Sequence, residues 1–248
     1  MMDHPGLPKP TNQTSDGDGR TKPVADVIEK YLSDLYRIAR TRKMSAIENQ
    51  VLEEMEAHAR EGDFPIVGPL VGPFLEFEAG QITAKRVFEF GSGFGYSAFW
   101  FARAVGSAGK VICVEGDEEN VARGREWVSR LGFQDRVEFH CAMAQDVFSR
   151  EVGTFDVVYN DADKDQYPGI WELAKGRIRP GGLYICDNTL WSGRVAAKPG
   201  TFVDVMPGWT EAIVAHNRAV ALDSDFQFYL NPIRDGVLIA KRAQKSLT

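Results

Sequence analysis

Two acidic clusters in the chain have the composition of a site for a hard metal ion. The first, NDADKDQY (residues 160–167), follows the β-rich run FDVVY, and the second, DNTLWSG (residues 187–193), follows the run LYIC. The carboxyl ends of neighbouring parallel strands meet at one edge of a sheet, so we expect Asp161, Asp187 and Asn188 to lie within reach of one point. Two carboxylates and an amide oxygen favour Mg²⁺, Mn²⁺ or Ca²⁺ over Zn²⁺. The alternative for each cluster alone is that Asp and Asn cap helices and turns.

A glycine-rich turn, GSGFG (residues 91–95), follows the run VFEF and precedes a segment of helical length. Glycines there permit positive φ and let a ligand lie against bare backbone. The next β-rich run ends in Glu115, whose carboxylate can hold both hydroxyls of a ribose, so the two features indicate a nucleoside site. The spacing is GxGxG and not the GxGxxG of dinucleotide sites, and Glu89 repels a pyrophosphate but suits a cationic ligand such as S-adenosylmethionine. The alternative is that the turn only reverses the chain.

Both features belong to a pattern of β-rich runs that alternate with helix-length segments from Arg86 onward. Alternation of this kind predicts an α/β fold with a parallel sheet and helices on both faces. The last two runs are separated only by PIRD, a link that can join only antiparallel strands, so the sheet should end in a hairpin. The expected strands cover residues 87–90, 111–115, 137–141, 155–160, 183–187, 226–231 and 236–242.

The N-terminal part lacks this alternation. Residues 1–23 combine Pro, Gly, Thr, Asn and Asp without apolar periodicity, so we expect a mobile arm. From Val24 apolar residues recur at spacings of three and four, which predicts a helical extension over residues 24–80. No linker is visible after residue 80, and residues 24–248 are therefore interpreted as one domain that includes the extension.

The composition disfavours several classes of protein. No apolar run of the 248 residues approaches the ~20 that span a bilayer, and the first residues contain no apolar signal core, so we expect neither membrane insertion nor secretion. Cys113, Cys141 and Cys186 form an odd set without CxxC spacing and are interpreted as free, buried strand residues of a cytoplasmic protein. A net charge of −6 without a basic stripe disfavours nucleic acid and favours a small-molecule partner.

Three segments together resemble a known family. EFGSGFGYS, DADKDQY and DNTLWSG, in this order and at this spacing, are similar to segments of the cation-dependent O-methyltransferases, the family of caffeoyl-CoA and catechol O-methyltransferases. The resemblance runs from about Ile66 to Arg242. It implies a Rossmann-like methyltransferase fold with a mostly parallel seven-stranded sheet, S-adenosylmethionine as methyl donor, and a divalent cation, Mg²⁺ first, that chelates two vicinal oxygens of a small aromatic substrate. It also suggests a homodimer.

The resemblance assigns roles to individual residues. Asp161, Asp187 and Asn188 match the metal ligands of the family, and Asp161 also lies against the substrate. Lys164 matches the lysine assigned as general base in catechol O-methyltransferase. The residues that match the donor site are Val67, Glu89, Gly91, Ser92, Gly93, Ser97, Glu115, Ala144 and Asp163.

On the acceptor side, the resemblance points to Trp191 and Ser192. Ser192 departs from the Asn of the plant pattern, which leaves the identity of the acceptor open. Trp209, before the final hairpin, could either wall the acceptor pocket or pack in the core, and the sequence does not decide between them.

The chemistry explains these residue types. Methyl transfer from a sulfonium to a phenol is an in-line displacement, so the protein must align donor and acceptor and present the acceptor as an oxyanion. A bound cation would hold a catechol through both oxygens and lower the hydroxyl pKa from about 10. Lys164 could then remove the proton. Its alternative role is a solvated lysine or an ion pair with Asp163 or Asp165.

Three other functions stay open at this level. A metal-independent methyltransferase would use the acidic clusters only as caps. A nicotinamide oxidoreductase would use the glycine turn, although the missing GxGxxG spacing argues against it. A non-catalytic nucleoside-binding module would need neither Lys164 nor the three candidate ligands, and the presence of all four argues against that module.

Overall fold

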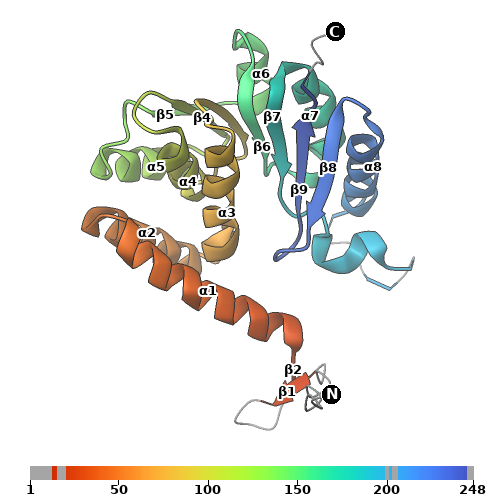
Figure 1. Cartoon of the computed structure of the whole chain (residues 1–248), viewed down its shortest axis with the longest axis horizontal. Coiled ribbons are helices and arrows are strands. Elements are labelled where there is room, and N and C mark those ends of the chain that lie inside the picture. Colours follow the sequence, from red (N-terminus) through yellow and green to blue (C-terminus); the bar gives the residue numbers. More distant parts are fainter. Residues whose placement is uncertain (1–12, 16–20, 199–200, 203–205, 245–248) are drawn as a thin grey trace, which may run out of the picture.

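The computed structural model describes residues 13–15, 21–198, 201–202 and 206–244. A seven-stranded sheet at its centre consists of β3 (Arg86–Phe90), β4 (Lys110–Glu115), β5 (Val137–Cys141), β6 (Phe155–Asn160), β7 (Ile178–Cys186), β8 (Phe226–Asn231) and β9 (Val237–Arg242). The strand order is β5-β4-β3-β6-β7-β9-β8 (Figure 1). β3 to β7 are parallel, and β9 pairs antiparallel with both β7 and β8. The predicted α/β sheet with a C-terminal hairpin is confirmed.

One strand is longer than the sequence indicates. The expected strand covers residues 183–187, whereas β7 begins at Ile178 and continues through Pro180 and Gly181. These two residues are typical of a turn, because proline donates no ladder hydrogen bond and Gly181 has a φ of +76°. The pairing of β6 with β7 is irregular here, and this register shift accommodates them.

Helices cover both faces of the sheet. Alternate side chains of a strand point to opposite faces, so Val87 packs with one set of helices and Phe88 and Phe90 pack with the other. The first face carries α4 (Tyr96–Val105) and α5 (Glu118–Arg130), and the second carries α6 (Ala144–Arg150), α7 (Tyr167–Ala174) and α8 (Trp209–Leu222). Three short 3-10 helices complete the fold: η1 (Lys164–Gln166) after β6, η2 (Lys175–Arg177) after α7 and η3 (Trp191–Ala196) after β7.

The predicted helical extension is present as α1 (Val24–Lys43), α2 (Ala46–Glu61) and α3 (Gly68–Gln81). α2 and α3 pack in the same core cluster as α4, while α1 extends away from the body of the protein (Figure 1). Of the predicted arm, β1 (Gln13–Ser15) pairs antiparallel with β2 (Thr21–Pro23), and residues 1–12 and 16–20 lie outside the described residues. Within the described part, no helix combines the length and apolar character that crossing a bilayer requires.

The described residues leave the apolar stripe of α1 exposed. Ile28 is 52% exposed, Tyr31 63% and Ile38 62%. The periodicity therefore predicts the helix correctly, but it does not reveal that the described residues leave this apolar face uncovered.

The cysteines are partly as expected. Cys113 and Cys186 are buried, but the interpretation of Cys141 as buried is wrong, because this thiol is exposed. Alternation along β5 would place Cys141 on the same face as the buried Val137 and Phe139. Cys141 is, however, the last residue of β5, which is an edge strand of the sheet, and burial of that face does not extend to it.

The ends of three neighbouring strands lie in register. Phe90 of β3 pairs with Asn160 of β6, and Asn160 pairs with Cys186 of β7. Gly91, Asp161 and Asp187 are therefore the first residues beyond three adjacent strands, which lie about 4.8 Å apart. The strand order reverses between β3 and β6, and this is where ligands bind in open α/β sheets.

Candidate active site

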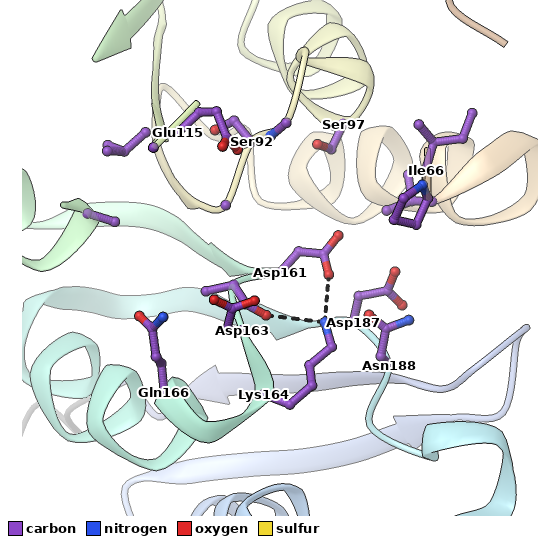
Figure 2. A pocket seen from close by; sticks show the side chains of 18 of the residues that line it. Ile66, Ser92, Ser97, Glu115, Asp161, Asp163, Lys164, Gln166, Asp187 and Asn188 are labelled. Carbon is purple, nitrogen blue, oxygen red and sulfur yellow. Dashed lines mark hydrogen bonds and ion pairs between the residues drawn. The ribbon is translucent and has the colours of Figure 1, made fainter. Parts of the chain in front are cut away.

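A cavity of about 620 Å³ opens at this edge of the sheet (Figure 2). The glycine turn after β3, the loops after β6 and β7, the entry to α3 and the turn between β8 and β9 form its walls. Glu89 and Ser192 do not line it. The sequence-predicted residues that do line it are Val67, Gly91, Ser92, Gly93, Ser97, Glu115, Ala144, Asp161, Asp163, Lys164, Asp187, Asn188 and Trp191.

The glycine turn packs directly against the first acidic loop. Gly91, Gly93 and Gly95 have φ values of +76°, +50° and +90°, in the region that favours glycine. A Cβ atom on Gly91 would lie 2.6 Å from the backbone oxygen of Asp161. The turn therefore depends on glycine both for its own conformation and for the close approach of the two loops.

We expect Gly91→Ala to lower both the stability of the fold and its affinity for a donor nucleoside. The left-handed conformation costs an L-residue about 1–2 kcal/mol, and the overlap with backbone adds to this cost. Gly106→Ala is a matched control, because Gly106 has a φ of +67° but open space where its Cβ would be. Thermal unfolding and calorimetric titration with S-adenosylhomocysteine measure the two effects. Equal losses in both variants would contradict the role of the close contact.

Glu89 lies beneath the turn rather than in the cavity wall. Its side chain is fully buried, accepts a hydrogen bond from the Ser97 hydroxyl, and lies 3.4 Å from the Cys113 Sγ, which donates to it. Burial raises the pKa of Glu89 to about 7. A cation bound at the turn would stabilise the ionised carboxylate, so the position suits a positively charged ligand.

Glu115 is held against the turn by backbone N–H groups. Its Oε2 accepts from the Gly93 N–H at 2.8 Å, and its Oε1 accepts from the Asp117 N–H at 3.0 Å. A carboxylate has about four lone-pair sites, so these two bonds leave capacity for the hydroxyls of a ribose. The geometry is compatible with the predicted role of Glu115.

Asp161 and Asp187 bring two carboxylates together at the base of the cavity. Asp187 is 5% exposed, and the Asp161 side chain is 26% exposed. Burial raises the pKa of Asp161, and burial together with the charge of Asp161 raises the pKa of Asp187 to about 7. Figure 2 shows Asn188 beside them, in a left-handed conformation with φ of +54°. A divalent cation would offset the repulsion between the two ionised carboxylates. Two carboxylates and an amide oxygen therefore fit such an ion.

Other groupings of metal-binding side chains are absent from the described part of the chain. There, no three or more His, Cys, Asp or Glu side chains come together as a metal site. The candidate set contains only two such residues and Asn188, so water and substrate oxygens would have to complete an octahedral shell.

Lys164 is the cation closest to this pair. Its Nζ lies 3.3 Å from Asp161 Oδ1 and 3.2 Å from the Ala162 carbonyl oxygen, and it lies 5.1 Å from the centre of the Tyr167 ring. The residue is 8% exposed and lines the cavity. Among the described ion pairs, Lys164 is therefore joined to Asp161 and not to Asp163 or Asp165.

Two tryptophans form an aromatic wall. The rings of Trp191 and Trp209 lie 5.7 Å apart, and both residues line the cavity, so Trp209 is a wall residue. Ser192 is exposed and lies outside the cavity lining, and its backbone N–H donates to the Asp235 carboxylate. Its side chain is therefore not among the described groups that border the cavity.

The sequence analysis did not identify Arg234, which lies in the turn between β8 and β9. Its guanidinium donates from one nitrogen to the carbonyl oxygens of Ile66, at 2.8 Å, and Val67. Gly68 makes room for it, because a Cβ there would lie 2.8 Å from that nitrogen. The predicted C-terminal hairpin could have indicated this position. Since β9 is antiparallel to both β7 and β8, β8 has the same direction as β7, and the turn after β8 lies at the same edge of the sheet as the acidic loops.

Comparison with known proteins places this geometry in a family. A family model described as O-methyltransferase matches residues 42–243. Caffeoyl-CoA O-methyltransferase from Eucalyptus gunnii is 29% identical over 182 residues, which cover 71% of this chain and 73% of that protein. Catechol O-methyltransferase from Niastella koreensis is also 29% identical over 182 residues, with coverages of 72% and 79%.

A solved structure agrees with this assignment. The O-methyltransferase from Bacillus cereus in complex with SAH superposes with a TM-score of 0.73 at 26% identity, covering 87% of this chain and 97% of that one. The match is incompatible with a nicotinamide oxidoreductase. With a family model that spans most of its length and a sheet of the expected topology, the chain belongs to the O-methyltransferase family that its three motifs resemble.

Proposed function

We propose that this enzyme transfers a methyl group from S-adenosylmethionine to one hydroxyl of a small catechol-like or phenylpropanoid aromatic, with the help of a divalent cation. The observation that carries the proposal is the pair of carboxylates at the base of the cavity, Asp161 and Asp187, each with a raised pKa. They face the same cavity as the glycine turn, so a donor and a cation-bound acceptor would share one space. The relatives that act on caffeoyl-CoA and catechol support an aromatic acceptor.

The donor would lie along the glycine turn. Glu89 suits its ammonium group, and Glu115 suits the two hydroxyls of its ribose. Val67 and Ala144 also line the cavity, and backbone contacts to the donor are proposed for both. Further donor contacts are proposed for Gly91, Ser92, Gly93, Ser97 and Asp163.

Asp161, Asp187 and Asn188 would hold the cation, with Mg²⁺ as the first candidate and Mn²⁺ or Ca²⁺ as alternatives. When bound, the cation would lower the pKa of the acceptor hydroxyls and fix both oxygens of a vicinal diol. Lys164 would take the proton from the reacting hydroxyl. Trp191 and Trp209 would pack against the aromatic ring and exclude water from it.

Removal of divalent cations tests this proposal directly. We expect methyl transfer to catechol, caffeic acid and its CoA ester to stop with excess EDTA and to return with added Mg²⁺. The assay follows formation of S-adenosylhomocysteine on the full chain. Activity that is indifferent to EDTA would contradict the assignment of the three ligands and favour a metal-independent methyltransferase.

We also propose a cytoplasmic homodimer, in which the exposed apolar stripe of α1 is covered by a second copy of the chain. Tyr31 and Ile38 are both more than 60% exposed, and burial of such a face is favourable by about 25 cal/mol per Å². Light scattering should give twice the 27.6 kDa of one chain, and Tyr31→Glu should shift the mass to that of a monomer. A monomeric wild-type protein would contradict the dimer.

A further inference from the structure

A chain of hydrogen-bonded side chains lies buried between the sheet and α8, beneath the two acidic loops. Asn160, at the end of β6, Tyr184 in β7 and His216 in α8 are each fully buried. The Asn160 Nδ2 donates to the Tyr184 hydroxyl at 3.0 Å, and that hydroxyl lies 2.9 Å from the His216 Nε2. The three residues link three separate elements of the fold.

Both ends of this chain reach the backbone of an acidic loop. At one end, Asn160 Oδ1 accepts from the Ala162 N–H at 3.3 Å, next to Asp161. At the other end, His216 Nδ1 lies 3.1 Å from Asn217 Oδ1, and Asn217 Nδ2 donates to the Thr189 carbonyl at 2.8 Å, next to Asn188. A continuous hydrogen-bond path thus connects the loop after β6 to the loop after β7.

The donors and acceptors along the path have one consistent assignment. Because the Tyr184 oxygen accepts from Asn160, its own proton is free to go to the His216 Nε2. The Nε2 is then an acceptor, and the proton of a neutral ring must lie on Nδ1, where it donates to Asn217. Burial lowers the pKa of His216 to about 4, so the ring is neutral at physiological pH.

A second contact ties the same histidine to Asp187. The Tyr167 hydroxyl donates to the Asp187 backbone oxygen at 3.0 Å, and the Tyr167 ring packs edge-on against the His216 ring, with centroids 5.3 Å apart. Buried polar networks contribute little net stability compared with apolar packing, but they fix geometry when every member is satisfied. This network touches the loop of every candidate cation ligand and none of the ligand side chains.

We propose that Asn160, Tyr184, His216 and Asn217 are positioning residues that hold the two acidic loops at the separation required by a divalent cation. The inference rests on the proposed function, in which Asp161 and the Asp187 loop bind that cation. Groups that orient metal ligands typically change cation affinity by about 10- to 100-fold when removed.

Mn²⁺ binding in the absence of donor and acceptor is the first test. The variants Tyr184→Phe and His216→Phe break the path. Ile213→Ala removes fully buried apolar volume from α8, the helix that carries His216, without removing a hydrogen bond of the path. We expect the two path variants to weaken Mn²⁺ binding, measured by electron paramagnetic resonance, by about 10- to 100-fold. Ile213→Ala should lower the melting temperature at least as much and keep the affinity. Mn²⁺ affinity that simply follows the melting temperature across all three variants would overturn the proposal.

Two readouts are independent of the cation. With four histidines in the chain, ¹⁵N-histidine spectra should show His216 as the neutral form protonated on Nδ1. Amide exchange at Ala162 should accelerate in Tyr184→Phe and not in Ile213→Ala. Unchanged exchange at Ala162 in Tyr184→Phe, or a proton on Nε2 in the wild type, would overturn the positioning role. Failure of the wild-type chain to bind Mn²⁺ would instead contradict the proposed cation dependence.

Discussion

Asp187→Asn should abolish methyl transfer while making the cation-free fold more stable at neutral and alkaline pH. The substitution keeps the size of the side chain but removes one of the two anionic ligands, and a catalytic cation is worth several kcal/mol of transition-state stabilisation. We therefore expect kcat/KM to fall by about 10³-fold or more. Binding of S-adenosylhomocysteine should be retained, because the glycine turn is not altered.

The stability effect follows from the raised pKa of Asp187. In the fold this pKa is about 7, against an ordinary value of 3.8. The folded state therefore binds a proton more tightly than the unfolded state does, and the free energy of unfolding decreases as pH rises from about 4 to about 7. Asparagine has no charge to bury, so the variant should melt above the wild type at pH 8 and lose this advantage near pH 4.

Melting curves in EDTA between pH 4 and pH 8, with parallel assays in Mg²⁺, measure both effects. Asp165→Asn is the control: Asp165 is exposed, lies in the same acidic segment, and is outside the cavity lining. It should change neither the activity nor the pH dependence of melting. An Asp187→Asn enzyme with near-normal kcat would falsify the assignment of Asp187 as a ligand. A variant that melts below the wild type at pH 8 would contradict the conclusion that the buried, ionised Asp187 destabilises the fold.

The parts of this site that sequence reasoning could find are those set by local pattern. Each strand that delivers Gly91, Asp161 or Asp187 is a buried run bounded by polar or glycine residues, and parallel strands must end at a common edge. Phe90 pairs with Asn160, and Asn160 pairs with Cys186, so the three strands end at the same level and the residues after them form a compact site. The two acidic clusters could be assigned to one edge of the sheet from the sequence without knowledge of these strand pairings.

The parts that sequence reasoning missed depend on long-range choices of partner. Arg234 reaches carbonyl groups at residues 66 and 67, and His216 bonds Tyr184 across 32 positions. Arginine in a turn and histidine in an apolar helix have many possible partners, and periodicity does not choose among them. The same holds for α1, whose period predicts a helix but cannot say what covers its apolar face.

Lys164→Met should lower kcat by about 10²- to 10⁴-fold, the usual contribution of a positioned proton acceptor. The Lys164 Nζ lies 3.3 Å from Asp161 Oδ1 inside the cavity, at the place where an acceptor hydroxyl bound beside the carboxylates would lose its proton. Donor affinity should not change. A Lys164→Met enzyme with normal kcat would show that the hydroxyl loses its proton without this side chain.

Lys164 also supplies charge, and a second variant separates this role from proton transfer. Lys164 is the strongest influence that lowers the pKa of Asp161 against the effect of burial. In Lys164→Met that pKa should rise, so Mn²⁺ binding should require a higher pH than in the wild type. Lys164→Arg keeps the positive charge but cannot accept a proton at neutral pH. It should therefore bind Mn²⁺ with the wild-type pH dependence and still lose most of kcat, whereas a near-normal kcat would reduce the role of Lys164 to that of a counter-ion for Asp161.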